Sequence, residues 1–84
     1  MHEIFIEHSV EHDLRKIVKK DFNRIISAVK LLAKNPRPFG SHKITGYENY
    51  HRIKVGDYRI IYEVDDKEKL IKIMRIRHRR EVYR

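Results

Sequence analysis

The residues of this chain that could carry out chemistry are mostly cations, and they gather in two stretches. The first stretch surrounds the dipeptide Gly56-Asp57 and contributes Arg52, Lys54 and Arg59. The second is the segment 75–84, in which five arginines stand with one histidine and one tyrosine. Its candidate site residues are Arg77, His78, Arg79, Arg80 and Tyr83. Guanidinium and ammonium groups at this density point to a bound anion, and phosphate is the obvious candidate.

The sequence lacks the residue patterns of other common catalytic sites. It has no glycine-rich phosphate loop, no histidine pair spaced i,i+4 around a glutamate, and no carboxylate cluster with metal-ligand spacing. Ser9, Ser27 and Ser41 lack the surroundings of a nucleophile elbow, and there is no cysteine. We therefore expect neither a metal nor another cofactor.

The residue types that remain are suited to cleaving RNA without a metal. In this reaction the ribose 2′-hydroxyl attacks the adjacent phosphorus, so an enzyme needs a base, charge stabilisation and an acid for the leaving 5′-oxygen. An arginine binds two phosphate oxygens at once, and one preorganised donor commonly lowers the barrier by about 3–4 kcal/mol. A lysine surrounded by arginines is shifted toward its neutral form, which makes Lys54 a candidate base. His78 is a candidate for proton exchange, and Tyr83 for stacking a base or positioning a proton.

Plainer roles fit the same residues, and composition alone favours polyanion binding over catalysis. Arg52 and Lys54 fit an exposed strand face, and Arg59 fits an ion pair with Glu63 or Glu81. The histidine and tyrosine of the C-terminal segment fit ordinary surface positions. The net charge of +8 suits a nucleic acid, an anionic membrane surface or an acidic protein, and charge does not distinguish these partners.

Length and composition predict one small folded domain that comprises residues 1–84. The hydrophobic content of 40% and the clear periodicity outweigh the 38% of charged residues. The absence of cysteine fits a reducing cytosol, and the N-terminal segment has no basic leader. No stretch approaches the roughly 18 apolar residues of a membrane span, so we expect a cytoplasmic protein without a membrane partner.

Periodicity predicts an N-terminal strand followed by two helices. Residues 3–7 alternate in the manner of a strand, and apolar residues at helical spacing predict a helix over 10–20 with Ser9 as its cap. After Lys19-Lys20-Asp21, a second helix is predicted over 22–33, and the prolines that follow end it. Neither helix can bury its apolar stripe alone, so the two should pack as an αα-hairpin on another layer.

The rest of the chain predicts a mostly antiparallel sheet, which completes an α+β fold with about four to five strands. A short strand is expected at 42–45, a hairpin at 50–62 and a final strand at 69–77. Layers of this kind would hold the two basic stretches in fixed positions relative to each other.

The Gly56-Asp57 hairpin decides which of the cations share a face of the sheet. A two-residue loop pairs Lys54 with Arg59, and alternation places both of them and Arg52 on one face. Like charges placed directly opposite each other destabilise a sheet by about 0.2–1 kcal/mol. That cost suits a fold in which an anion binds over these residues.

The final strand carries apolar residues at both parities, which leaves its register dependent on the preceding polar turn. The two sets are Leu70, Met74 and Ile76 at one parity and Ile71 and Ile73 at the other. A three-residue loop would place Arg75 and Arg77 on the same face as Arg59, whereas an even-numbered loop would not. We favour the three-residue loop.

Two stretches together resemble the RelE branch of the RelE/ParE toxin superfamily. The hairpin sequence at 52–62 (RIKVGDYRIIY) and the C-terminal sequence at 76–83 (IRHRREVY) carry the resemblance, which covers essentially the whole chain. It implies a RelE-like α+β fold and a toxin of a type II toxin–antitoxin system. It further implies a ribosome-dependent endonuclease that cuts mRNA in the ribosomal A site without a metal. Its partners would be the ribosome with its rRNA, and a cognate antitoxin that wraps the toxin in a hetero-oligomer.

The resemblance also implies roles for individual residues. Arg59 matches an arginine that stabilises the phosphorane, Arg79 the arginine after the last strand, and Tyr83 the tyrosine near the end. Arg52 and Lys54 match the basic pair of the first hairpin strand, and His78 falls where some relatives place a histidine. The residues expected to bind RNA are Arg52, Arg77 and Arg80.

Two other functions remain open at the level of the sequence. A ParE-like inhibitor of DNA gyrase would use the same fold without RNA chemistry. A catalytically inert relative would only bind its antitoxin or nucleic acid. Retention of the basic residues and the tyrosine favours the nuclease.

Overall fold

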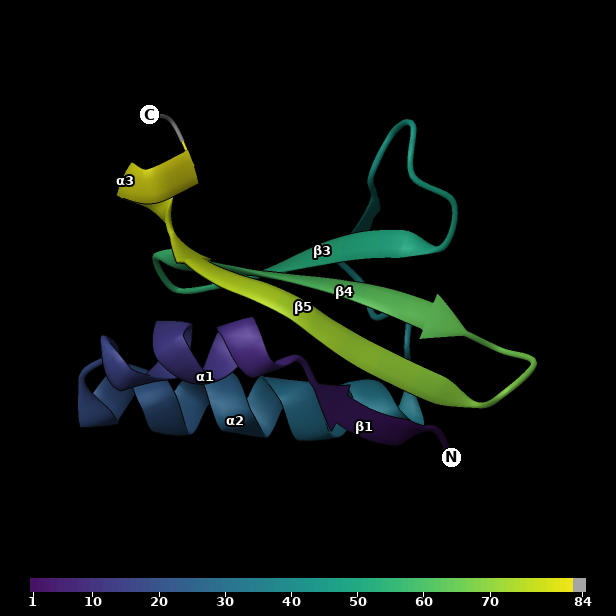
Figure 1. Ribbon diagram of the computed structural model, residues 1–84, viewed down its shortest axis with the longest axis horizontal. Coiled ribbons are helices and arrows are strands. Elements are labelled where there is room, and N and C mark those ends of the chain that lie inside the picture. The colour runs from purple at the N-terminus through teal and green to yellow at the C-terminus, as the bar shows by residue number, and fades with distance from the viewer. Residues whose placement is uncertain (83–84) are drawn as a thin grey trace.

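The computed structural model describes residues 1–82 and consists of a helical layer packed on a five-stranded sheet (Figure 1). Its elements are β1 (Glu3–Ile6), α1 (His8–Arg15), α2 (Lys19–Lys34), β2 (His42–Lys43), β3 (Tyr50–Val55), β4 (Tyr58–Asp65), β5 (Leu70–His78) and α3 (Arg79–Val82). The strand order is β1-β5-β4-β3-β2, in which β1 and β5 are parallel and the other neighbours antiparallel. The predicted α+β fold, with its N-terminal strand, two-helix hairpin and mostly antiparallel sheet, is confirmed.

The two long helices cover only one face of the sheet. α1 and α2 lie below the sheet in Figure 1, whereas α3 and the loop between β2 and β3 rise above it. Alternate residues of the strands point toward the helices and form the core with the helical stripes. The most deeply buried side chains are Tyr62, Ile25, Leu32, Ile60, Ile71, Ile73, Val10 and Val64. α1 and α2 leave the opposite side of the sheet uncovered, and this side is here called the outer face.

The first helix is shorter than predicted. α1 ends at Arg15, so the prediction of a helix over 10–20 is wrong, and its N-cap is Glu7 rather than Ser9. The reversal toward α2 then uses residues 16–18 instead of Lys19-Lys20-Asp21.

The early reversal changes which side chains begin α2. Val18, the N-cap of α2, has an extended backbone and is 64% exposed, although it would complete the apolar stripe of a longer first helix. Ile17 before it still reaches the core. Starting α2 at Lys19 places Asp21 in its first turn, where the helix dipole stabilises a negative charge.

The central hairpin has the predicted register. β3 and β4 pair with Lys54 opposite Arg59 and Ile53 opposite Ile60 across a two-residue loop. Gly56 has a φ of +58°, the conformation that the first position of a type II′ turn requires. A Cβ atom on this glycine would lie 3.2 Å from the Nη1 atom of Arg24, so the turn also packs closely against α2.

The turn between β4 and β5 differs from the prediction. Asp65 pairs with Leu70, which leaves four residues between them, so the expected three-residue loop is wrong. With this turn alone, Arg75 and Arg77 would point away from the face that carries Arg59.

A β-bulge in β5 reverses that outcome. Tyr62 pairs with Ile73, but the preceding residue, Ile61, pairs with Arg75. Met74 is therefore an extra residue, and every side chain after it points to the face opposite to the one that an unbroken strand would give. The prediction that Arg75 and Arg77 share the face of Arg59 is confirmed, through a bulge instead of a loop length.

Asp13 of α1 fastens the bulged part of β5. Its side chain is 7% exposed, and its Oδ2 atom accepts a hydrogen bond from the N–H of Ile76 at 3.1 Å. The same oxygen lies 3.5 Å from the Nε atom of Arg75. β1 ends beside Ile73, so beyond that residue no strand within residues 1–82 pairs with this edge of β5. The Asp13 carboxylate instead accepts the hydrogen bond that a neighbouring strand would otherwise accept.

His51 is a buried titratable group on the helix side of β3. It is 7% exposed, and its ring centroid lies 5.7 Å from that of Tyr62, whose hydroxyl donates a hydrogen bond to the carbonyl of Pro36 at 2.7 Å. Burial lowers the pKa of His51 below 6.5, and the positive charges of Arg37 and Lys43 lower this pKa further. Burial also raises the pKa of Tyr62.

We expect His51 to make the fold less stable in mild acid. Because its folded-state pKa is below 6.5, the unfolded chain binds more protons once the pH falls below that value, and the free energy of unfolding decreases. His51→Phe keeps a ring against Tyr62 and removes the titration. Urea unfolding from about pH 7.5 to about pH 5.5 should show a smaller loss in the variant. An equal loss of stability in His51→Phe and in the wild type would contradict this expectation.

Asp66 affects stability in a different pH range. Hydrogen bonds from Arg37 and His2 hold its pKa below 3.8, so its effect on the free energy of unfolding belongs to lower pH.

Candidate active site

Three cations lie in line across the outer face. Lys54 on β3 pairs with Arg59 on β4, and Arg59 pairs with Arg77 on β5. Directly paired residues present their side chains on the same face, so these three residues form a row, here called the cation row. Since neighbouring strands lie about 4.8 Å apart, the row spans about 10 Å. Like charges placed directly opposite each other in a sheet are destabilising by up to about 1 kcal/mol per pair.

A second line of residues runs beside the cation row. Arg52 on β3 pairs with Ile61 on β4, and Ile61 pairs with Arg75 on β5. His42 on β2 pairs with Arg52 and extends this line toward the edge of the sheet. Only the bulge makes the line possible, because without it Arg75 would face the helices.

The turn of the central hairpin positions Arg79. The N–H of Arg79 donates a hydrogen bond to the carbonyl of Asp57 at 2.7 Å, and its Nη1 atom lies 3.8 Å from the Asp57 carboxylate. These contacts fix the start of α3 beside the cation row, so that Arg79 reaches it from outside the sheet. Sequence analysis did not identify Asp57 as this anchor, because it was considered only as a turn residue.

Two hollows lie over this part of the outer face. The first has a volume of about 390 Å³ and is lined by four cations, Lys54, Arg59, Arg79 and Arg80. The second has a volume of about 210 Å³ and is lined by Gly40, His42, Arg52, Ile53, Lys54 and Arg59. Because both include Lys54 and Arg59, they form one surface that runs from α3 toward β2. The structure thus brings together most of the predicted site residues, and it adds His42, which sequence analysis had placed only in a short strand.

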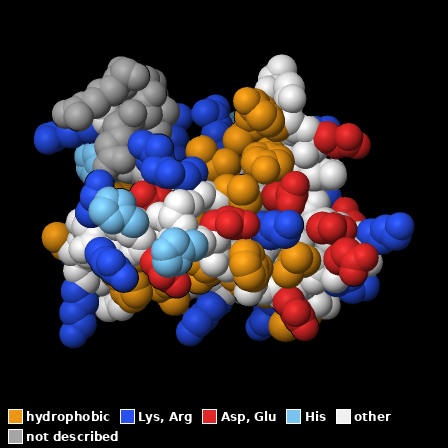
Figure 2. All heavy atoms as spheres, in the orientation of Figure 1, with side chains coloured by type: hydrophobic (Ala, Val, Ile, Leu, Met, Phe, Trp, Pro, Cys, Tyr) orange, Lys and Arg blue, Asp and Glu red, His pale blue; other side chains and the backbone are white. Residues whose placement is uncertain are grey.

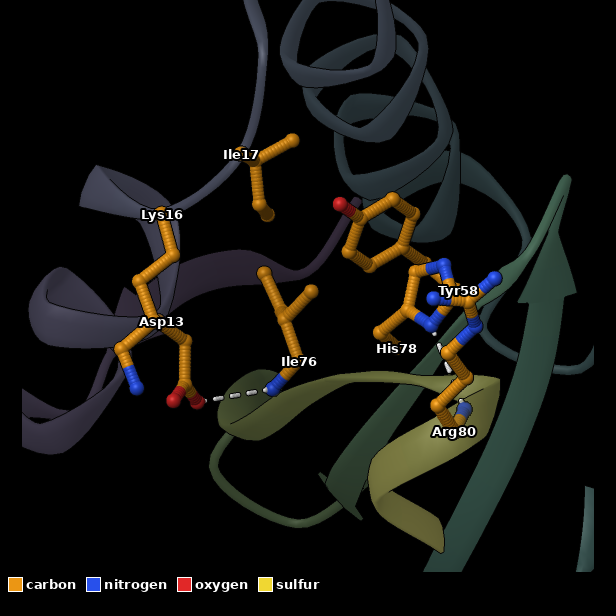
Figure 3. Close-up of a pocket in the computed structure, with 7 residues that line it drawn as sticks. All are labelled: Asp13, Lys16, Ile17, Tyr58, Ile76, His78 and Arg80. Atoms are coloured by element: carbon orange, nitrogen blue, oxygen red, sulfur yellow. Dashed lines mark hydrogen bonds between the residues drawn. The ribbon is translucent and has the colours of Figure 1, made fainter.

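His78, which was expected to exchange a proton at this site, lies elsewhere in the structure. It follows Arg77 in β5, and because neighbouring residues of a strand alternate, it points to the helix side. Its ring meets Tyr58 edge-on, with centroids 5.1 Å apart, and its Nδ1 atom accepts a hydrogen bond from the N–H of Arg80 at 3.2 Å. Together with Asp13, it lines a separate hollow of about 280 Å³ (Figure 3). The sheet separates it from the cation row.

The remaining predicted residue, Tyr83, lies outside the described residues. Within residues 1–82, no group of three or more histidine, aspartate and glutamate side chains could hold a metal ion. None of the helices in this part of the chain is long and apolar enough to cross a membrane.

The site thus belongs to a small α+β domain in which a two-helix hairpin covers one face of a five-stranded sheet and cations lie in line across the other face. A sequence model of the family described as "ParE toxin of type II toxin-antitoxin system, parDE" matches residues 4–83, so the chain belongs to this family of type II toxins. Among curated proteins, the toxin RelE3 of Methanocaldococcus jannaschii is 46% identical over 41 residues. That match covers 49% of this chain and only 44% of the length of RelE3.

Solved structures supply matches over nearly the full chain. The RelE–RelB complex of Pyrococcus horikoshii OT3 contains a chain that matches with a TM-score of 0.83 and 30% identity, over 93% of this protein and 94% of that chain. The RelB–RelE antitoxin–toxin complex of Methanococcus jannaschii gives a TM-score of 0.76 and 29% identity, over 94% of each chain. These relatives place the protein in the RelE branch of the superfamily, as the sequence resemblance implied.

Proposed function

We propose that this toxin cuts mRNA in the ribosomal A site by attack of a ribose 2′-hydroxyl on the adjacent phosphorus, without a metal. The observation that carries the proposal is the cation row, with Arg79 held against it by the hairpin turn. Several donors that converge on one hollow can bind a phosphate and stabilise the extra negative charge of a phosphorane. Their positions are set by sheet pairing before substrate arrives, which is what makes such donors effective.

Each residue of the site then has a distinct task. Arg59, at the centre of the row, contacts the phosphorane oxygens, and Arg77 and Arg79 flank it. Lys54 accepts the proton of the 2′-hydroxyl as the new O–P bond forms. The bond from phosphorus to the 5′-oxygen breaks, which leaves a cyclic 2′,3′-phosphate and a 5′-hydroxyl. With His78 on the other side of the sheet, we assign the proton donated to the leaving oxygen to Tyr83. Arg52 and Arg80 bind the neighbouring RNA backbone.

The relatives with similar structures are complexes with RelB antitoxins, and we propose that this toxin also binds a cognate antitoxin in a hetero-oligomer. The charge of +8 suits an acidic partner, and a groove of about 320 Å³ offers apolar contact. It is lined in part by Leu31, Leu32, Phe39 and Val55, of which Leu31 and Phe39 are exposed. A ribosomal target places the active toxin in the cytoplasm.

Inhibition of DNA gyrase is the second candidate function, because the matching family is named for ParE toxins. A supercoiling assay separates the two functions. A ribosome-directed nuclease should leave gyrase activity unchanged at concentrations that arrest translation.

Mapping of mRNA 5′ ends tests the proposal directly. After induction of the toxin, new 5′-hydroxyl ends should appear within translated reading frames at codon positions, and purified toxin should cut the same mRNA only when ribosomes are present. Lys30→Ala, on the exposed side of α2, removes one positive charge far from the cation row and should cut normally. Growth arrest without new mRNA ends would disprove the nuclease. Equal cutting of free RNA would disprove the dependence on the ribosome.

A further inference from the structure

The outer face of β3 continues past the cations to a pair of aromatic rings. Tyr50, Arg52 and Lys54 alternate along β3, so all three share the outer face. The ring of Tyr50 lies 5.7 Å from that of Tyr47, with an angle of 39° between the ring planes. Tyr47 is 62% exposed. Lys54 and Tyr50 are four residues apart, which corresponds to about 13 Å along the strand.

The loop that carries Tyr47 is held by its own backbone. The N–H of Ile44 donates to the carbonyl of Tyr50 at 2.9 Å, and the N–H of Tyr50 donates to the carbonyl of Tyr47 at 3.3 Å. Asn49, with a φ of +67°, accepts a hydrogen bond from the N–H of Val64 at 2.9 Å, which ties the loop to β4. In Figure 1 this loop rises above the sheet at the end opposite to α3. The backbone that carries the two rings is therefore held in place before any ligand binds.

The surroundings of the rings favour a nucleic acid over a peptide. Arg52 stands between the rings and the cation row, and its cross-strand neighbour His42 adds a further polar side chain. Glu63, opposite Tyr50, lies 3.8 Å from Lys72, so its charge is compensated. Figure 2 shows lysines and arginines near the α3 end of the upper surface and hydrophobic side chains, a class that includes tyrosine, toward the loop. Phosphate-binding groups followed by aromatic rings are the elements of a single-stranded RNA site.

We propose that Tyr47 and Tyr50 form a nucleobase subsite, on which a base of the RNA stacks while its scissile phosphate lies on the cation row. The proposal of this subsite rests on the proposed RNA substrate. It adds a position at which the toxin contacts the strand away from the cleaved bond. Arg52 binds the backbone between the two positions. Stacking accepts any base, so the subsite contributes affinity and alignment rather than sequence preference.

The test uses the full chain and a fluorescent single-stranded RNA whose riboses are all 2′-O-methylated, so that no nucleophile is available for cleavage. Affinity is measured by anisotropy at low salt, with one abasic residue moved along the strand. The variants are Tyr47→Ala, Tyr50→Ala and, as the matched control that keeps the ring, Tyr50→Phe. Circular dichroism confirms that each is folded. Since Tyr47 is exposed, its variant remains informative if Tyr50→Ala unfolds.

The proposal expects each alanine variant to bind about tenfold more weakly, because a stacked base is lost, while Tyr50→Phe binds like the wild type. An abasic residue at one position should weaken the wild type by a similar factor and Tyr47→Ala much less. The salt dependence should not change, since no phosphate contact is removed. An abasic scan without effect on the wild type would overturn the subsite, as would alanine variants that lose affinity for the antitoxin and retain it for RNA.

Failure of the subsite and failure of the nuclease have different signatures. If wild-type toxin cuts mRNA on ribosomes but both alanine variants bind RNA normally, only the subsite is wrong. If the abasic scan shows the expected position but no mRNA is cut, the subsite stands and the nuclease is wrong.

Discussion

Arg59→Ala should reduce ribosome-dependent cleavage of mRNA about 100- to 1,000-fold, the usual cost of removing one preorganised donor from a developing charge. Arg59 is the central member of the cation row and lines both hollows over the outer face. Lys54 and Arg77 flank it on the adjoining strands. The loss should appear mainly in kcat, since phosphate binding by the other cations remains.

Two comparisons make this result specific. Arg59→Lys keeps the charge but not the planar fork, so its activity should lie between that of the wild type and that of the alanine variant. Lys30→Ala removes the same charge from the far side of the molecule and should retain full activity. Cleavage is followed by primer extension on stalled ribosomes over a range of toxin concentrations. Activity of Arg59→Ala within a factor of about three of the wild type would rule out Arg59 as the phosphorane stabiliser.

Asp13→Ala should lower the free energy of unfolding by about 2–3 kcal/mol, although Asp13 belongs to no predicted site. The change leaves the buried N–H of Ile76 without its acceptor and the Nε atom of Arg75 without its nearby charge. Removing one partner from a buried polar contact costs more than the contact contributes, because the group left behind stays desolvated. The edge of β5 that Asp13 covers would lose its attachment to α1.

Asp13→Asn is the matched comparison for this stability effect. Its side-chain oxygen can still accept the hydrogen bond from Ile76, so it should lose only about 1 kcal/mol. Urea unfolding monitored by circular dichroism measures both variants. A loss of less than about 0.5 kcal/mol in Asp13→Ala would mean that water or another group replaces the carboxylate.

The parts of the fold that depend on local pattern were predictable from the sequence. Alternation and the Gly56-Asp57 turn define the central hairpin, and these two features alone place Lys54 opposite Arg59. The helix boundaries were harder to predict, because the apolar stripe continues through Val18 while the chain reverses there. Which residue begins the second helix depends on packing against the sheet, and periodicity does not contain that information.

The sequence of β5 contains a signal for its register, but we attributed that signal to the length of the β4–β5 turn. Apolar residues change parity along the strand, from Ile71 and Ile73 to Ile76, and all three are buried. A straight strand cannot bury both sets, whereas one extra residue between them can. The change of parity therefore indicates a bulge near Met74, and no choice of loop length is needed to explain it.

Two side chains lie in places that the sequence did not lead us to expect, for different reasons. His78 was considered for proton exchange from its residue type and from the resemblance, but an outward Arg77 requires an inward His78, so strand parity already indicated the other face. Asp13 was missed because its partner is a backbone N–H 63 positions away in the sequence. Contacts of this kind become visible only when the tertiary structure is known.

The bulge at Met74 divides β5 into two halves with different structural roles. The half before it joins β1 and belongs to the scaffold, whereas the half after it is bounded by Asp13 and presents the arginines. The face of the sheet on which the arginines lie is therefore set at the bulge and not at the β4–β5 turn.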